Sequence, residues 1–400
     1  MALFQNNDRI LFVGGPLTHG THFVEYIYDY YLTRYPNRRL RMTYAGDSSD
    51  TTESAIERMH DDLQDFAPRA AVLMLGLNDM QPWRYLKSKP QVFERHARVR
   101  AHTVFEERLR YLCQGLIRRQ VVPLLVKPAP GAPMAFSAPR PGFVEAMGQA
   151  ADTVGRTAAA MGLEMIDLYS PLLEAARREA QLLEPAGLYQ ADGLHTAELG
   201  DLVMAASFIS QQQTLEPAAY LAISGRSVRS KGVRLQQLQT DKSHLSMIYE
   251  PNCLPFPLVS RYFDAQLLCP ISEFLNRQIL AVDLEEGVYL MAMDAKPCGR
   301  YTSRQLKKGV NLAVARSSPL QEAAQALAAE VAQWTAIQQQ LRTQRAIDSL
   351  PAKVGKRPAP EQTLSRAQIE ALQARAEALA AGFYQHNAPS PCRITLQRVG

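Results

Sequence analysis

The sequence predicts an α/β protein built on a parallel sheet, and three features of its first half lead to this prediction. Short apolar runs alternate with longer amphipathic stretches through about residue 212. The short runs are apolar along their whole length, which is typical of strands that are covered on both faces. Several of them end in glycine-rich or polar loops, and a parallel sheet binds its ligands where such loops gather.

Five strands and six helices are expected in this half, from the length and period of the apolar pattern. The expected strands are residues 9–15, 40–46, 71–78, 121–127 and 164–168. The expected helices are residues 21–35, 52–66, 99–119, 143–161, 171–184 and 198–212. Polar or glycine-rich loops follow three of the strands, at 14–20, 46–52 and 76–79, and we expect the functional site there.

The second half has a different pattern. Residues 220–315 contain short alternating segments, and 287–303 predict a strand, a turn and a second strand. A long helix, opened by Ser318 and Pro319, is expected over 318–347, then a Pro- and Lys-rich linker over 353–362. A helix over 365–382 and a final strand over 392–399 follow. We therefore divide the chain into an α/β domain, a small β domain and a helical tail: 1–212, 213–316 and 317–400.

Composition indicates a soluble globular protein, with 46% hydrophobic and 21% charged residues. The net charge is +5, but no basic run is interleaved with aromatic residues, so we expect no nucleic-acid partner. No segment has the length of a membrane span, and the N-terminus does not resemble a signal peptide, so a cytoplasmic location is expected. The five cysteines are scattered without a CxxC pair, so we expect no disulfide framework, no metal and no cofactor.

Four short motifs stand at the strand ends or before the last helix of the first domain. They are Gly14-Gly15-Pro16-Leu17-Thr18-His19-Gly20, Ser48-Ser49-Asp50-Thr51-Thr52, Gly76-Leu77-Asn78-Asp79 and Asp192-Gly193-Leu194-His195. In this order and placement they resemble the four blocks of the SGNH/GDSL hydrolase family. The resemblance implies a flavodoxin-like, three-layer α/β/α domain with a five-stranded parallel sheet, followed by a smaller β domain and a helical C-terminus.

The resemblance also implies a role for each matched residue in ester hydrolysis. Asn78 matches a side-chain donor to the oxyanion, Asp192 the carboxylate that orients the base, and His195 the base itself. Ser49 stands where the family has a glycine whose amide faces the oxyanion. We expect Gly15, Pro16, Ser48 and Gly76 to line the binding site beside these catalytic positions.

Pro16 departs from the family pattern at the position of the nucleophilic serine. Proline has neither a hydroxyl group nor a backbone N–H, so it supplies neither the attacking atom nor an oxyanion donor. The ordinary acyl-serine mechanism is therefore expected to be absent. Residues 287–294, 299–313 and 318–319 resemble the tail of two-domain bacterial hydrolases of this type, and 213–280 resemble it less.

Two other interpretations of these loops stay open. Gly46-Asp47-Ser48 spells the family's serine motif, but it follows the second strand, where a polar turn is the simpler reading. His19 and His22 flank a short turn, without an acidic residue at metal-ligand spacing. We favour loop histidines there and expect no metal site.

Three functions fit the sequence. The preferred one is a hydrolase scaffold without catalysis that binds an acyl- or glycan-like ligand or a protein partner. The alternative is a divergent hydrolase or acyltransferase in which His195 and Asp192 act as a general base on water or an acceptor, or in which Ser48 or Ser49 attacks. The third is a scaffold whose β domain and tail mediate assembly. The sequence leaves the substrate and the oligomeric state open.

Overall fold

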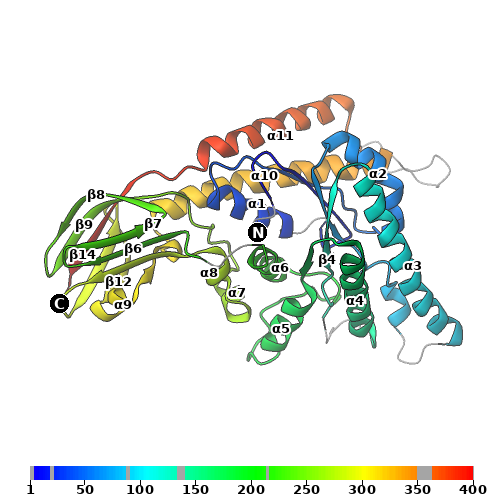
Figure 1. Cartoon of the computed structure of the whole chain (residues 1–400), viewed down its shortest axis with the longest axis horizontal. Coiled ribbons are helices and arrows are strands. Elements are labelled where there is room, and N and C mark those ends of the chain that lie inside the picture. Colours follow the sequence, from blue (N-terminus) through cyan, green and yellow to red (C-terminus); the bar gives the residue numbers. More distant parts are fainter. Residues whose placement is uncertain are drawn as a thin grey trace.

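The parallel sheet and its helices lie at one end of an elongated molecule, and two further sheets lie at the other end (Figure 1). The computed structural model describes residues 4–18, 22–86, 91–132, 140–212, 216–348 and 363–399. His19, Gly20 and the expected linker at 353–362 lie outside these ranges. No helix within them combines the length and the apolar character that a membrane span requires.

The first sheet has five parallel strands in the order β2-β1-β3-β4-β5. They are β1 (Arg9–Gly14), β2 (Arg41–Tyr44), β3 (Ala70–Met74), β4 (Val122–Lys127) and β5 (Met165–Asp167). This order is that of flavodoxin-like folds, and it places the topological switch point between β1 and β3. The predicted fold class is confirmed. β3 ends four residues earlier than predicted, shortly before Gly76 turns the chain with φ +126°.

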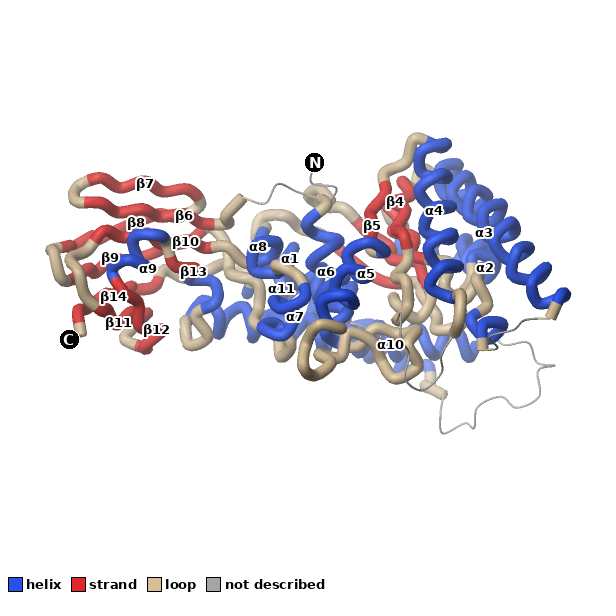
Figure 2. The backbone as a smooth tube through the Cα atoms, turned by 90° about the horizontal axis from the view of Figure 1, so that it is seen from below, coloured by secondary structure: helices blue, strands red, loops and turns tan. Residues whose placement is uncertain are grey.

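Helices cover both faces of this sheet. Figure 2 shows α2, α3 and α4 on one side of the strands and α1, α5 and α6 on the other. They are α1 (Phe23–Arg34), α2 (Thr52–Phe66), α3 (Val92–Arg118), α4 (Phe143–Met161), α5 (Tyr169–Glu179) and α6 (Glu198–Ser210). α3 begins seven residues before the predicted start, because Gln91 and Glu94 form a capping box there. A short 3₁₀ helix, η1 (Pro82–Tyr85), precedes it.

The β region contains two sheets, with the strand orders β13-β10-β6-β7 and β12-β11-β14-β9-β8. The first comprises β6 (Ala219–Ser224), β7 (Ser227–Lys231), β10 (Gln278–Asp283) and β13 (Val310–Asn311). The second comprises β8 (Val233–Thr240), β9 (His244–Pro251), β11 (Val288–Met293), β12 (Lys296–Thr302) and β14 (Cys392–Arg398). Short helices connect them: α7 (Tyr262–Leu268), α8 (Ile271–Leu275), α9 (Ser303–Lys308) and η2 (Leu312–Val314).

Two long helices join the ends of the molecule (Figure 1). α10 (Pro319–Asp348) runs from the β region to the parallel sheet, and α11 (Arg366–His386) returns beside it. Trp334 of α10 packs edge-on against Tyr28 of α1, at 5.5 Å between ring centroids. The chain then enters β14, which pairs with both β9 and β11. The predicted division into three domains stays a prediction, but the tail completes a sheet of the β region.

Candidate functional site

The ends of β1, β2 and β3 approach one another so closely that two glycines are required. A Cβ atom on Gly14 would lie 2.6 Å from the carbonyl oxygen of Met74 and from Oγ1 of Thr18. A Cβ atom on Gly46 would lie 2.6 Å from the carbonyl oxygen of Gly14. Contacts this short are not tolerated, so the glycines let the three loops converge at the switch point of the sheet.

Pro16 lies in a tight turn directly after β1. The amide of Thr18 donates to the carbonyl of Gly15 at 3.0 Å, and the Thr18 hydroxyl donates to the same carbonyl at 2.8 Å. Pro16 is therefore the second residue of a β-turn, a position that suits the fixed φ of proline. Leu17 does not adopt a positive φ, which indicates a type I turn. Proline thus fits the backbone here without strain.

A small cavity opens beside Pro16. Its walls come from the loops after β1 to β4 and include Gly15, Asp50, Gly76 and Pro128. Its volume is about 10 Å³, which is close to the least space that a single water molecule needs. The predicted lining residues Gly15, Pro16 and Gly76 thus share one cavity.

Asn78 holds two loops together with its side-chain amide. Its Nδ2 donates to the backbone carbonyls of Ser48 and Asp50, both at 3.0 Å. A Cβ atom on Gly15 would lie 3.4 Å from the same Nδ2, so the amide group adjoins the turn that contains Pro16. Asn78 is therefore beside the predicted nucleophile position, with two backbone acceptors for its amide hydrogens.

The neighbouring Asp79 has a structural contact in α2. Its Oδ1 accepts hydrogen bonds from the amide and the hydroxyl of Thr52, at 3.0 and 2.6 Å. Burial raises the pKa of Asp79, and the two bonds from Thr52 oppose that rise. The third motif therefore fixes the first turn of α2 to the end of β3.

Ser48 and Ser49 are both exposed. The amide and the hydroxyl of Ser49 donate to Oδ1 of Asp47, at 3.1 and 3.0 Å. The carbonyl of Ser48 accepts from Asn78. These contacts form a polar turn, which is the structure that the sequence favoured for Gly46-Asp47-Ser48. In this geometry the Ser49 amide has an acceptor within its own loop.

His195 and Asp192 form a hydrogen-bonded pair before α6. Nδ1 of the imidazole contacts Oδ2 of Asp192, while Oδ1 accepts from the amides of Leu194 and His195 at 2.9 and 3.1 Å. Partial burial opposes ionisation of the carboxyl group, but the two amides and the imidazole outweigh it and lower the pKa of Asp192. The carboxylate both closes the turn and fixes the ring. The side chains are about one-third exposed, at 33% for His195 and 38% for Asp192.

Two hydrogen bonds to backbone carbonyls of this turn, one from the Ala132 amide and one from the Arg140 side chain, connect it with the segment after β4. The amide of Ala132 donates to the carbonyl of Gly193 at 2.7 Å, and Arg140 donates to the carbonyl of Asp192 at 2.6 Å. Because Pro128 lines the cavity beside Pro16, the loop after β4 adjoins both the turn of Pro16 and that of His195. Among the described residues, Asp192 is the one hydrogen-bond partner of the His195 ring.

Sequence reasoning missed three residues that support this edge of the sheet. Arg58 of α2 binds both carboxylate oxygens of Asp50, and Arg140 supports the turn of Asp192. Asp201 of α6 accepts from the amide of His22 at 2.9 Å and contacts the Thr196 hydroxyl. The contacts of Arg140 with Asp192 and of Asp201 with His22 join segments far apart in the sequence, which no local pattern connects.

His22 precedes α1 and contacts two residues of that helix. Its ring lies 3.5 Å from Glu25 and stacks on Tyr26. The hydrogen bond with Glu25 raises the pKa of His22 more than burial lowers it. Among the residues that the structure describes, no group of three His, Cys, Asp or Glu side chains is arranged to hold a metal ion.

Residues 12–201 match the sequence profile described as the GDSL-like Lipase/Acylhydrolase family. The structure of BT4096, described as a gut microbial diltiazem-metabolizing enzyme, superposes with a TM-score of 0.87 at 18% identity. That match covers 100% of this chain and 99% of BT4096, so the two proteins share a fold over their whole length.

A second structure resembles the first half alone. Axe2, an acetylxylan esterase from Geobacillus stearothermophilus, is 20% identical with a TM-score of 0.43. The match covers 54% of this chain and 97% of Axe2. A comparison with curated protein sequences gave no significant match.

Proposed function

Because residues 12–201 match the sequence profile of the GDSL-like lipase/acylhydrolase family, we propose that this domain binds a ligand without hydrolysing it through an acyl-serine intermediate. The proposal depends on Pro16, which occupies the turn directly after β1 where the family carries its nucleophile. Proline offers no hydroxyl to attack and no amide hydrogen to the oxyanion. In studied hydrolases, loss of one oxyanion donor costs about 3–4 kcal/mol, and loss of the nucleophile costs on the order of a million-fold in rate.

The geometry of the neighbouring serines supports the same proposal. A replacement nucleophile requires a hydroxyl within hydrogen-bond reach of the His195 imidazole. The Ser49 hydroxyl donates to Asp47 instead, and the Ser48 carbonyl is bound by Asn78. Neither hydroxyl contacts the His195 ring in the described part of the chain.

The proposed ligand is an acyl- or glycan-like molecule, or a protein partner, that contacts the open edge formed by Asn78 and His195. The imidazole is about one-third exposed, and its Nδ1 is held by Asp192, so the ring can present Nε2 to a ligand as a hydrogen-bonding group. N-Acetylglucosamine is a suitable probe, since it joins an acyl group to a sugar through an amide. We expect saturable binding by calorimetry, weakened about tenfold in His195→Ala. Binding unaffected by that substitution would place the sugar elsewhere.

Ester hydrolysis tests the loss of catalysis. We expect wild-type protein and the His195→Ala variant to hydrolyse p-nitrophenyl acetate at the same background rate. The Pro16→Ser variant should gain hydrolysis that depends on His195, because it restores both a hydroxyl group and an amide hydrogen. Wild-type hydrolysis that disappears in His195→Ala would contradict the proposal.

One observation favours a second candidate, a hydrolase or acyltransferase that uses the imidazole as a general base. The His195–Asp192 pair is assembled, and the pKa of Asp192 is lowered, as expected for a carboxylate that orients a base. Such an enzyme would activate water or a bound acceptor directly. Wild-type turnover of an ester or thioester that is lost in Asp192→Asn, without labelling of any serine, would favour this candidate over the first.

A further inference from the structure

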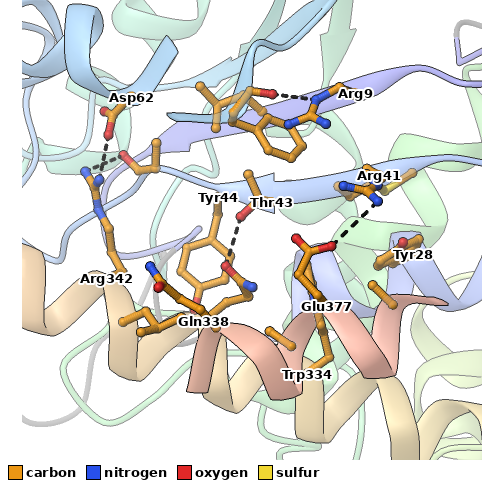
Figure 3. A pocket seen from close by; sticks show the side chains of 18 of the residues that line it. Arg9, Tyr28, Arg41, Thr43, Tyr44, Asp62, Trp334, Gln338, Arg342 and Glu377 are labelled. Atoms are coloured by element: carbon orange, nitrogen blue, oxygen red, sulfur yellow. Dashed lines mark hydrogen bonds and ion pairs between the residues drawn. The ribbon is translucent and has the colours of Figure 1, made fainter. Parts of the chain in front are cut away.

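A second cavity lies between strands β1 and β2 of the parallel sheet and the helix pair α10–α11 (Figure 3). Its volume is about 300 Å³, at the lower end of small-molecule sites. We call it the arginine cavity. The charged residues that line it are Arg9, Arg41, Asp62, Arg342, Arg345 and Glu377. None of these residues belongs to the four motifs of the candidate site.

The arginine cavity carries more positive than negative charge. Four guanidinium groups face two carboxylates, and both carboxylates already have partners. Asp62 binds Arg342 at 2.6 Å and lies 3.7 Å from Arg58. Glu377 lies 3.6 Å from Arg41 at the exposed mouth of the cavity. The six charged side chains of the lining therefore sum to a formal charge of +2.

The positive charge of Arg9 has no ion-pair partner among the described residues. Its Nε donates to the carbonyl of Phe66, and its guanidinium lies 4.5 Å from the centre of the Phe66 ring. Within the described residues, no carboxylate lies within ion-pair distance of it. Burial lowers the pKa of Arg9, the charge of Arg41 lowers it further, and the more distant charge of Glu377 opposes part of this shift. An anion bound here would offset both effects.

The two arginines are held side by side by the sheet. Arg9 of β1 is the direct register partner of Arg41 of β2, so the two side chains leave the same face of neighbouring strands. Both also line an adjoining cavity of about 530 Å³, which includes Arg39 and Tyr384. Like charges placed beside each other cost free energy unless an anion lies between them. The pair is thus placed where the two cavities meet.

The rest of the wall is apolar or neutral. Tyr28 and Trp334 lie below the arginines in Figure 3, and Leu11 and Met42 of the sheet line the cavity as well. Gln338 contacts the Thr43 hydroxyl at 3.5 Å. A ligand pocket typically combines such an apolar surface with a few charged groups that fix orientation.

We propose that the arginine cavity binds a small organic anion whose carboxylate or phosphate group lies between Arg9 and Arg41, with its apolar part against Tyr28 and Trp334. Guanidinium groups suit both anions, because their paired N–H donors match two oxygens at once. Which of the two anions binds is decided by the experiment below.

Calorimetry on the full chain tests the proposal with phenyl phosphate and benzoate as probes and benzyl alcohol as the uncharged probe. We expect saturable binding of at least one anion, and binding of benzyl alcohol at least about tenfold weaker. The Arg41→Gln variant should bind the anion several-fold more weakly, and Arg9→Gln combined with Arg41→Gln at least about tenfold more weakly. The anion that binds more tightly identifies the class.

Three further variants make the result specific. Arg300→Gln removes an exposed guanidinium of the β region and should leave binding unchanged. Ala380→Phe fills the cavity without changing its charge and should abolish binding, which keeps the test valid if Arg9→Gln fails to fold. His195→Ala should not affect the anion, so the outcome is independent of the proposed function. The proposal is overturned if neither anion binds saturably, or if Arg41→Gln and Ala380→Phe both bind like wild type.

Discussion

Under the proposed function, Pro16 stands in place of the family's nucleophile without disturbing the backbone around it. The turn from Gly15 to Thr18 is closed by bonds from Thr18 to the carbonyl of Gly15, and it uses no hydrogen from position 16. In the proposed function, proline therefore supplies neither an attacking group nor an oxyanion donor, while the turn itself is kept. The residues that remain, Asn78 and the His195–Asp192 pair, make contacts that also hold loops in place. Asn78, Asp192 and His195 therefore have a structural role in these loops in addition to any chemical role.

The buried side chain of Asp29 gives a prediction about a single residue. It is 1% exposed in α1, and neither carboxylate oxygen has a hydrogen-bond partner among the described residues. Burial raises its pKa well above the usual value, and Glu25 adds to the effect. The folded state therefore holds a proton that the unfolded chain releases above about pH 4, so stability falls as pH rises.

The Asp29→Asn variant is uncharged at every pH and lacks this dependence. Its free energy of unfolding, relative to wild type, should increase from pH 5 to pH 8 by up to about 1.4 kcal/mol per pH unit. Urea denaturation at several pH values measures the difference, with Asp61→Asn at an exposed position of α2 as the control. A difference that stays constant with pH would show that Asp29 is not protonated in the folded protein.

The elements of the first half were predictable because their signals are local. β1 and β4 are largely apolar runs, β2 alternates exposed and buried residues, and the observed bounds of all three lie within one or two residues of those predicted. The start of α3 was missed because its first turn exposes Val92 and Phe93, which removes the apolar period. The contact of Arg140 with Asp192 joins residues 52 positions apart, and no local pattern reports it. The arginine cavity was also missed, because it forms only when α10 and α11 cover β2.

Arg342 of α10 provides a prediction at the element scale. It is 10% exposed, and it binds Asp62 of α2 at 2.6 Å and the carbonyl of Ala45 after β2 at 3.2 Å. Burial raises the pKa of Asp62, and Arg342 opposes that rise. Replacing Arg342 with methionine leaves a buried carboxylate with Arg58 alone, so unfolding should become easier by about 3 kcal/mol.

The second substitution Asp62→Leu, added to Arg342→Met, should restore much of this loss, because it removes the unpaired charge. Chemical denaturation of the two single variants and the double variant gives the coupling energy directly. An Arg342→Met variant as stable as wild type would mean that α10 is held to the sheet by its apolar contacts alone.

At the scale of the whole molecule, the α10–α11 pair and β14 connect the parallel sheet with the β region. Trp334 contacts Tyr28 of the first half, and Tyr384 of α11 accepts from the amide of Leu40, at 2.6 Å, beside β2. β14 then lies between β9 and β11 in the second sheet of the β region. The C-terminal segment from α10 to β14 thus packs against the parallel sheet at one end of the molecule and completes a sheet of the β region at the other.

Removal of β14 should therefore unfold the sheet to which it belongs. A chain that ends at residue 390 loses the buried Ile394 and Leu396 and exposes the edges of β9 and β11. We expect a lower melting temperature and loss of β signal in circular dichroism, whereas a chain that ends at Arg398 should behave like the full chain. Unchanged spectra and an unchanged melting temperature in the shorter chain would show that the second sheet of the β region folds without β14.

The most direct measurement of the central claim, that the site has no activated hydroxyl, is reaction with a fluorophosphonate followed by intact mass spectrometry. We expect wild-type protein to react no faster than His195→Ala, and Pro16→Ser to gain a single His195-dependent adduct at position 16. The Pro16→Ala variant controls for the change in the turn, which should lower stability by about 0.4–1 kcal/mol. A stoichiometric adduct on Ser48 or Ser49 of wild type, lost in His195→Ala, would contradict the account.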